Sequence, residues 1–345
     1  MSSRTQWNWK NLLRWLPGVL ISAIALYVVI RLVNFQDLKK AFTTASWQFV
    51  IIVVLILFTS MLVRGKAWQT ILGNKVTWKQ AFFGISEGYL LNNVLPFRAG
   101  EIGRSIFIGQ SSKLGTFHVL STIVIERAFD VAMAASLVLI TLPLVVIKPW
   151  VKTVAMTALG LVIFGLLVLF LIARYREKVS NFIESNSHRW RFLEKHILPQ
   201  VNKLLDGLST LTHPSQFLLS FFWIALSWAM WVLMYDILVW QILPGAPVWK
   251  GAFVGSILSL GVAIPSAPAS LGVYEASMVG AIFYVGGSES AALAYAILLH
   301  VLQFVISAIF GVWGLIRDGQ SFSSLMSNLK LGQNNNREQH TETND

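Results

Sequence analysis

Three short motifs of this chain carry charged residues whose types can bind an ionic group. The motifs are LPFRAGEIGR at 95–104, IERAFD at 125–130 and PSAPASLGVYE at 265–275. Arginine forks bind carboxylates and phosphates through paired hydrogen bonds, whereas carboxylates bind cations or carry protons. Long apolar runs flank these motifs, and an ionised side chain at the centre of a membrane helix costs roughly 2.5–3.5 kcal/mol. The motifs therefore indicate a binding site rather than a solvated surface.

The composition places the chain in a membrane. Hydrophobic residues make up 55% of its 345 residues and charged residues only 12%, and apolar runs long enough to span a bilayer recur along it. The 27 Lys and Arg against 16 Asp and Glu give a net charge of +11, most of it in connecting segments. Such segments are typical of cytoplasmic faces beside anionic lipid, so the charge does not indicate nucleic-acid binding. Because there is no cysteine, disulfides, thiolate metal sites and cysteine nucleophiles are excluded.

Hydropathy predicts an all-α polytopic membrane protein. Windows of about 19 residues give six full spans, at 16–33, 47–63, 117–142, 153–173, 217–243 and 291–316. Two further regions, 80–110 and 250–286, each hold two short apolar pieces separated by proline and glycine. A piece of roughly 10–15 residues at about 1.5 Å per residue cannot cross a hydrocarbon core of about 30 Å. We therefore expect both regions to form re-entrant hairpins of broken helices.

The distribution of Lys and Arg predicts the orientation of these elements. Positive residues gather in the N-terminal segment 1–15, in the segment that runs from Arg64 to Lys79, and in the long connection 174–216. The positive-inside rule makes all three cytoplasmic. The two hairpins then enter the membrane from opposite sides.

Because the two hairpins enter the membrane from opposite sides, the two halves of the chain are predicted to form an inverted repeat. We expect one transmembrane domain at 16–317, with a first half at about 16–142 and a second half at about 153–317. The polar segment 318–345 is predicted to be a disordered cytoplasmic tail. Inverted repeats with broken helices are typical of transporters, because half-helix ends and unwound backbone supply binding groups near the middle of the bilayer.

The first hairpin has the features of an anion site. Pro96 and Gly100 are predicted to form its break, since proline removes an amide hydrogen and glycine permits close backbone approach. The amides after the break carry partial positive charge, and Arg98 and Arg104 add two full charges, so a phosphate would be stabilised there. In the alternative interpretation, these arginines simply pair with Glu101 at the membrane interface.

The second motif, IERAFD, places three ionisable side chains on one flank of a predicted span. Glu126 and Asp130 are one turn apart, and Arg127 is three residues before Asp130. Because of the cost of charge in lipid, this flank should face the bundle interior or a wet cavity. The trio is either a structural ion network or the wall that faces the first hairpin.

The second hairpin is predicted to break at Pro265, Pro268 and Gly272. Glu275 then lies in the first turn of the next half-helix, where the helix dipole stabilises a carboxylate. Capping alone would explain Glu275, and a functional role is the alternative. His300, within the last span, is interpreted as a buried hydrogen-bonding residue, with proton transfer as the alternative.

These motifs, in this order and separation, resemble those of the lysylphosphatidylglycerol synthase transmembrane family, also called the flippase-like family. The resemblance covers roughly the whole membrane region. Phe97 and the PAS at 268–270 depart from the pattern, since glycine is commoner there. The family includes the membrane half of multiple peptide resistance factors, which is associated with moving aminoacylated phospholipid between leaflets. In those proteins a soluble synthase domain follows, and we expect none here, so we expect no aminoacylation of lipid.

The resemblance implies a protein of the bacterial inner membrane. It implies a membrane lipid as the partner, with an anionic or aminoacylated headgroup on a phospholipid or a polyprenyl phosphate. It implies substrate-binding roles for Arg98, Glu101, Arg104, Glu126, Arg127, Asp130 and Glu275. Transport would be passive or coupled to an ion gradient, since no nucleotide-binding loop is present. We predict no catalytic residue, metal or cofactor, and a homo-oligomer or a partner enzyme is compatible with this assignment.

Two other classes remain open from the sequence. The first is a polyprenyl-phosphate-dependent glycosyltransferase, which would need acidic residues in an outward loop, where the chain offers only Asp37 and Glu289. The second is a carrier of a small solute or an ion. Both would use the buried charges differently from a lipid carrier.

Overall fold

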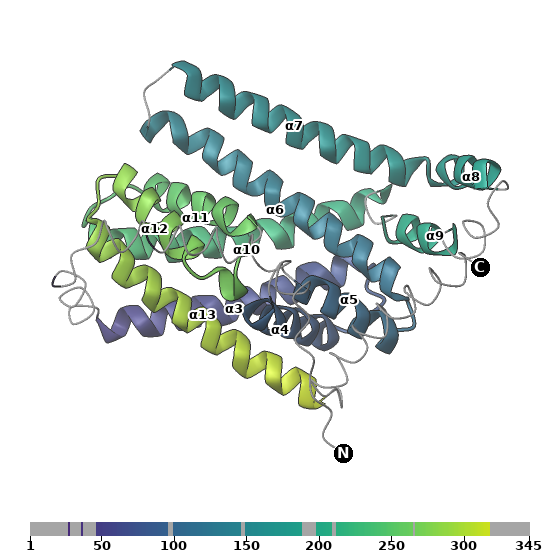
Figure 1. The fold of residues 1–345 in the computed structure, drawn as a ribbon, viewed down its shortest axis with the longest axis horizontal. Helices are drawn as coiled ribbons and strands as arrows, with labels where there is room; N and C mark the ends of the chain where they lie inside the picture. Colours follow the sequence, from purple (N-terminus) through teal and green to yellow (C-terminus); the bar gives the residue numbers. More distant parts are fainter. Residues whose placement is uncertain are drawn as a thin grey trace, which may run out of the picture.

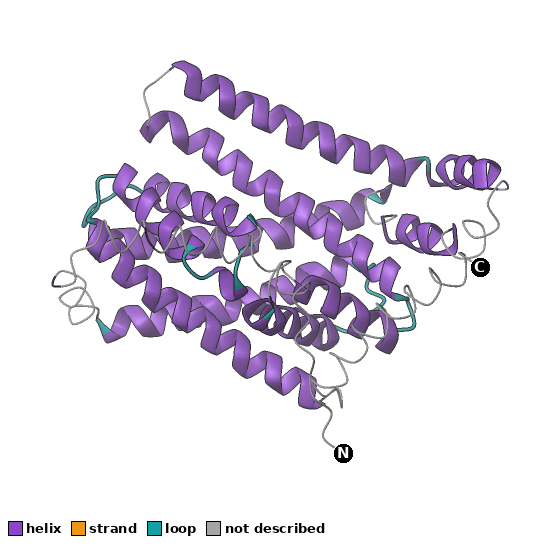
Figure 2. Ribbon diagram, viewed as in Figure 1, coloured by secondary structure: helices purple, strands orange, loops and turns teal. Residues whose placement is uncertain are grey.

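The computed structural model is a bundle of helices (Figure 1 and Figure 2). It describes residues 27, 36, 46–95, 99–145, 149–187, 198–208, 212–264 and 266–317. The helices are α3 (Trp47–Ile71), α4 (Trp78–Val94), α5 (Ala99–Ser111), α6 (Thr116–Val145), α7 (Pro149–Arg174), α8 (Arg176–Ser187), α9 (Leu198–Gly207), α10 (Pro214–Ile242), α11 (Val248–Ala263), the 3-10 turn η3 (Pro268–Ser270), α12 (Val273–Tyr284) and α13 (Glu289–Arg317). The described residues contain no strand, so the predicted all-α class is confirmed. The predicted first span and the C-terminal tail lie outside the described residues.

Within the part of the chain that the structure describes, four helices, α3, α6, α10 and α13, are long and apolar enough to cross a membrane. A fifth candidate joins Leu159–Arg174 of α7 to Arg176–Phe182 of α8, although the two pieces are bent by 78°. The predicted spans that begin at residues 47, 117, 217 and 291 each fall on one of the four long helices. The predicted cytoplasmic connection 174–216 contains the short helices α8 and α9.

Both predicted hairpins are pairs of short helices that contact each other. The first consists of α4 and α5, and the second of α11 and α12 with η3 between them. Pro268 begins η3, and Gly272 precedes α12 with a φ of 81°, so both lie at the predicted second break. Gly100 was predicted to lie in the first break, but it lies inside α5, where its role is close packing. Pro96, Arg98 and Pro265 lie outside the described residues.

The contacts between helices form two matching sets. In the first half α3, α4, α5 and α6 follow one another, and in the second half α10, α11, α12 and α13 do so. The helix α4 of the first hairpin packs on α13, and its counterpart α11 packs on α6, while α3 packs directly on α10. Ring pairs Phe49–Tyr295 and Phe58–Phe310, at 5.2 and 5.1 Å, show that α3 and α13 run in parallel. The helices α6 and α10 run the opposite way (Figure 1).

Local sequence signals explain where these elements begin. The Ser46 hydroxyl accepts a hydrogen bond from the amide of Phe49 at 3.2 Å and so caps α3. Thr77 and Gln80 form a capping box at the start of α4. These caps place the first hairpin helix directly after α3 with a short turn between them.

Packing divides the helices into buried and exposed ones. One apolar cluster joins α3 to α10–α13 around Tyr235 and Met278, and a second joins α3, α6 and α9 around Trp68 and Ile123. By contrast, α7 presents many large exposed apolar side chains, such as Leu161 and Phe164. This distribution is that of a membrane bundle whose outer helix faces lipid.

Candidate functional site

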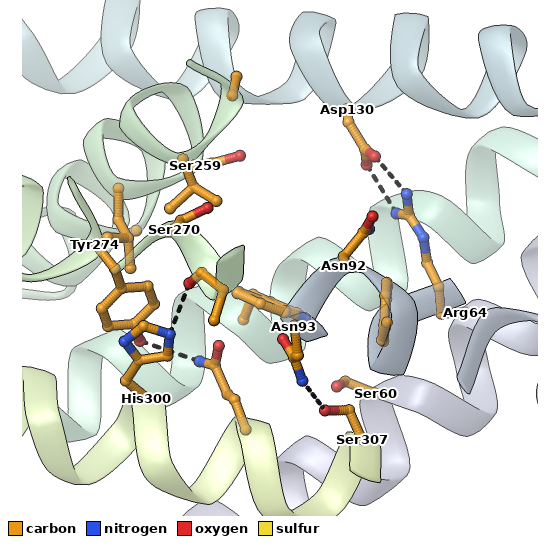
Figure 3. Close-up of a pocket in the computed structure, with 18 of the residues that line it drawn as sticks. Ser60, Arg64, Asn92, Asn93, Asp130, Ser259, Ser270, Tyr274, His300 and Ser307 are labelled. Atoms are coloured by element: carbon orange, nitrogen blue, oxygen red, sulfur yellow. Dashed lines mark hydrogen bonds and ion pairs between the residues drawn. The ribbon is translucent and has the colours of Figure 1, made fainter. Parts of the chain in front are cut away.

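The two hairpins and the four long helices surround one cavity of about 310 Å³ (Figure 3). Its lining comes from α3, α4, α5, α6, α10, α11, α12, α13 and the 264–270 break. Arg64 and Asp130 lie on one side, and Tyr274 and His300 lie on the other. Apolar side chains such as Trp231 complete the wall. The cavity therefore offers separate polar groups within an apolar enclosure, which is the usual make-up of a ligand site.

Glu126 is the centre of a buried ion network at the first side. One carboxylate oxygen accepts a hydrogen bond from Nε of Arg64 at 2.9 Å, and the other accepts one from a terminal nitrogen of Arg104 at 2.7 Å. The Glu126 side chain is 0% exposed and that of Arg104 is 2% exposed. The Arg104 guanidinium also lies over the Trp68 ring, 4.6 Å from its centroid. Glu126 and Arg104 support the cavity wall from behind and do not line it.

Asp130 ties this network to the cavity. It accepts two hydrogen bonds from the terminal nitrogens of Arg64, one of them 2.8 Å long. The Trp228 indole donates a further bond of 3.1 Å to the same carboxylate. Paired bonds of this kind fix both the aspartate and the arginine, so Arg64 is held rigidly at the wall.

Arg127 is the guanidinium of the network that is most open to the cavity. Its side chain is 31% exposed, against 8% for Arg64. Its ion pairs with Glu101 and Asp130 are both 3.2 Å long, and that with Glu126 is 3.4 Å long. These contacts are longer than those of the buried arginines, so Arg127 is the cation best placed to exchange a carboxylate partner for a ligand anion.

The described part of the network is electrically balanced. Three guanidinium groups, those of Arg64, Arg104 and Arg127, meet three carboxylates, those of Glu101, Glu126 and Asp130. Within this described set, an anionic group that binds a guanidinium takes the place of a carboxylate, whereas a zwitterionic group can contact both signs. The site favours a ligand whose own charges can replace an internal ion pair.

The opposite side of the cavity is built around His300. Its Nδ1 lies 2.6 Å from Oε1 of Glu275, and its Nε2 lies 2.9 Å from the carbonyl oxygen of Ala269. The other carboxylate oxygen of Glu275 accepts a bond of 2.7 Å from the amide of Gly272. Glu275 thus caps α12, as its position in the first turn predicts, and it also orients His300. Glu275 itself does not line the cavity.

The structure places the predicted site residues in three groups. Glu101, Arg127 and Asp130 line the cavity, while Arg104 and Glu126 lie behind them in the same network. Glu275 belongs to the opposite side, and Arg98 lies outside the described residues. The first two motifs thus meet, and the third lines the same cavity with residues such as Ala267, Ser270 and Tyr274.

The sequence places Arg64 in the connection after the predicted span 47–63, and this placement is wrong. The helix α3 continues to Ile71, so Arg64 is inside it and buried. The available signal was the absence of proline, or of a glycine-rich turn, between Leu62 and Ile71, since a single Gly65 does not end a helix. Asn92, Asn93 and Gln303 also line the cavity and were not predicted.

The residues described here contain no cluster of three or more His, Cys, Asp or Glu able to hold a metal ion. The polar groups around the cavity are instead ion pairs and single hydrogen-bonding side chains. These groups suit recognition of an organic headgroup.

The family model for the lysylphosphatidylglycerol synthase TM region matches residues 15–311. The chain belongs to this family. The match covers both hairpins and the ionic network, so the motif resemblance is confirmed. No curated protein matches the chain at a significant level. Family membership and the apolar helices together establish a multi-pass membrane protein related to lipid modification or translocation.

Proposed function

We propose that this family member moves a lipid with an anionic or aminoacylated headgroup between leaflets, or presents such a lipid to a partner. The headgroup belongs to a phospholipid or a polyprenyl phosphate. The observation that carries the proposal is the shared cavity. In it a partly exposed Arg127 lies among carboxylates, and apolar side chains such as Trp231 and Leu258 form other parts of the wall. An amphiphile needs both kinds of surface at once.

The reciprocal packing of the two helix sets supports an inverted repeat. The two hairpins start from opposite ends of the bundle, since α4 follows the end of α3 and α11 follows the end of the antiparallel α10. The break of the second hairpin reaches the first, because η3 contacts α4. Re-entrant hairpins that meet near the middle of the bilayer are a recurrent arrangement in carriers, because one half can rock against the other around a fixed site.

The distribution of positive residues supports the proposed orientation. Lys75, Lys203 and Arg317 lie near the bundle end where α3 finishes and α6 begins, and the net positive charge favours the cytoplasmic side. Lys250 lies near the other end, where it donates to the carbonyl of Val285 at 2.8 Å. This supports an inner-membrane protein whose first hairpin enters from the cytoplasm.

The carrier proposal predicts that Arg127→Gln slows lipid exchange. Loss of one charge-assisted hydrogen-bonding partner costs about 1.5–3 kcal/mol, which corresponds to a rate lower by roughly tenfold or more. The measurement is the exchange of fluorescent phosphatidylglycerol between the leaflets of reconstituted liposomes. The wild-type protein should exchange the lipid faster than protein-free vesicles do.

Arg176→Gln is the matched control, because it removes the same charge from an exposed pair. Arg176 lies 3.3 Å from Asp206, with side-chain exposures of 45% and 60%, and exposed pairs contribute little. This variant should exchange lipid at the wild-type rate. Exchange by the wild-type protein no faster than in empty vesicles, or equal effects of the two substitutions, would contradict the proposal.

A further inference from the structure

The two hydrogen bonds of His300 cannot both form if His300 is neutral and Glu275 is ionised. They require one additional proton on this pair. Nε2 faces a backbone carbonyl, that of Ala269, which can only accept a hydrogen bond. Nδ1 faces Oε1 of Glu275 at 2.6 Å. Both contacts are satisfied by an imidazolium beside a carboxylate, or by a neutral imidazole that accepts from a protonated Glu275. In either form the pair carries one extra proton.

Loss of that proton must break one of the two contacts. A neutral imidazole has one N–H, so either its Nδ1 lone pair would face the Glu275 carboxylate or its Nε2 lone pair would face the Ala269 carbonyl. Each arrangement sets two acceptors against each other. The single N–H stays with the Glu275 carboxylate, because a hydrogen bond to a charged acceptor is stronger than one to a neutral carbonyl. The bond to Ala269 is the one lost, so the backbone turn that carries Ala269 is held through the proton.

That turn has a strained backbone. Ala269 and Ser270 both have a φ of 56°, a left-handed conformation that non-glycine residues rarely adopt. The amide of Ser270 donates to the carbonyl of Ala267 at 2.9 Å, and the same segment contacts α4 of the other hairpin. Such a conformation persists only while surrounding contacts hold it, and the bond from His300 is one of these contacts.

The surroundings of the pair favour a protonated state and give a proton access to it. The Tyr274 ring stacks on His300 with centroids 4.3 Å apart, and an aromatic face stabilises a cation. Tyr274 on α12 and Tyr235 on α10 are the titratable groups nearby, and phenols are uncharged near neutral pH. Asn92 and Asn93 face the cavity from α4. The charged residues that line the cavity, Arg64, Glu101, Arg127 and Asp130, pair with one another on its opposite side. His300 is 12% exposed and lines the cavity.

We propose that His300 and Glu275 form a proton-binding site whose occupied state holds the 266–272 turn in place, and whose empty state releases that turn from the cavity wall. The ligand is a proton, and the moving part is the break of the second hairpin. Coupling of this site to lipid movement rests on the proposed function, whereas proton binding and release of the turn do not.

The variant Glu275→Gln distinguishes the effect of the proton from that of the hydrogen bonds. The amide oxygen can still accept from the amide of Gly272, and the amide nitrogen can donate to Nδ1 of a neutral His300, which keeps its bond to Ala269. This variant therefore preserves the geometry and removes the charge that holds the proton. It is also close in size to the native residue, so the fold is retained.

The first readout is the nitrogen NMR spectrum of histidine-labelled protein, with the His300 signals assigned by His300→Asn. In the wild type both ring nitrogens should be protonated at the acid end of a titration between about pH 5 and about pH 8. In Glu275→Gln only Nε2 should be protonated at the same acid end, because the amide donates to Nδ1. The same protonation of the ring in both proteins, or a singly protonated ring throughout the wild-type titration, would overturn the proton site.

The second readout is the accessibility of the turn. The chain has no native cysteine, so Ala267→Cys supplies a single labelling site in the turn, and Ser259→Cys on α11 supplies a reference in the same cavity. The ratio of their maleimide labelling rates should rise severalfold from acid to alkaline pH. In the Glu275→Gln background it should stay constant. A constant ratio in both backgrounds would overturn release of the turn.

The coupling of proton binding to lipid movement is tested by measuring leaflet exchange at both ends of this pH range. If the wild-type exchange rate changes with pH and that of Glu275→Gln does not, the proton site is coupled to transport. Absence of exchange at every pH would contradict the carrier function alone, since the NMR and labelling results stand without it. Exchange with the same pH dependence in both proteins would overturn the coupling.

Discussion

Glu126→Ala is expected to lower the free energy of unfolding by about 3–5 kcal/mol, because it removes the shared anion of a buried network. Arg64 and Arg104 would each lose a bond to the Glu126 carboxylate, of 2.9 and 2.7 Å respectively. Arg64 would keep Asp130, whereas Arg104 would keep its stacking on Trp68 but no carboxylate among the described residues. A buried guanidinium without a carboxylate destabilises the folded state strongly. Glu126→Ala is therefore one of the two substitutions with the largest expected effects.

The measurement is equilibrium unfolding in detergent or bicelles, with Asp206→Ala as the control. Asp206 is also a carboxylate paired with an arginine, but it is exposed, so its loss should cost under about 1 kcal/mol. Glu126→Gln should fall between the two, since an amide oxygen can still accept one bond. Equal losses for Glu126→Ala and Asp206→Ala would show that the network does not stabilise the fold.

Gly100→Ala is expected to open the first hairpin and to cost about 1–3 kcal/mol, as overpacking does. A β-carbon on Gly100 would lie 2.0 Å from the carbonyl oxygen of Gly88 and 2.9 Å from the backbone nitrogen of Asn92. Both obstacles are backbone atoms, so α4 and α5 would have to separate. The bond of 2.8 Å from the Gly100 amide to the Asn92 side chain would also be lost.

Gly160→Ala is the matched control for this prediction. Gly160 lies inside α7, and no heavy atom lies within 4 Å of its built β-carbon. Alanine there should be neutral or should stabilise the helix by roughly 0.5–1 kcal/mol. Thermal unfolding of both variants checks the contrast, and a Gly100→Ala protein as stable as Gly160→Ala would contradict the close packing of the hairpin.

Much of the fold is local in its causes and could be predicted from the sequence. The length of an apolar run decides whether a helix can cross a bilayer, and proline with glycine decides where a short one ends. The two hairpins follow from these signals alone. The end of α3 was misplaced because Arg64 was taken to mark an interface, whereas buried carboxylates on α6 compensate its charge inside the helix.

The pairing within the site could not be predicted, because it depends on tertiary structure. Arg64 and Glu126 are 62 residues apart, and nothing in either motif selects the other as its partner. The sequence likewise marks Glu275 as a possible cap but does not show that its second oxygen meets His300, 25 residues later. The motifs show which charged residues are present, but they do not show which of these residues pair with one another.

A structure determined in lipid nanodiscs tests most directly whether the cavity binds a lipid. The protein, enlarged with an antibody fragment, would be imaged by cryo-electron microscopy in phosphatidylglycerol nanodiscs. We expect headgroup density in the cavity against Arg127, with an acyl chain along Trp231 and Leu258. An empty cavity, with lipid only on the outer helices and Arg127 still paired with Glu101 and Asp130, would contradict a lipid-binding role for this site.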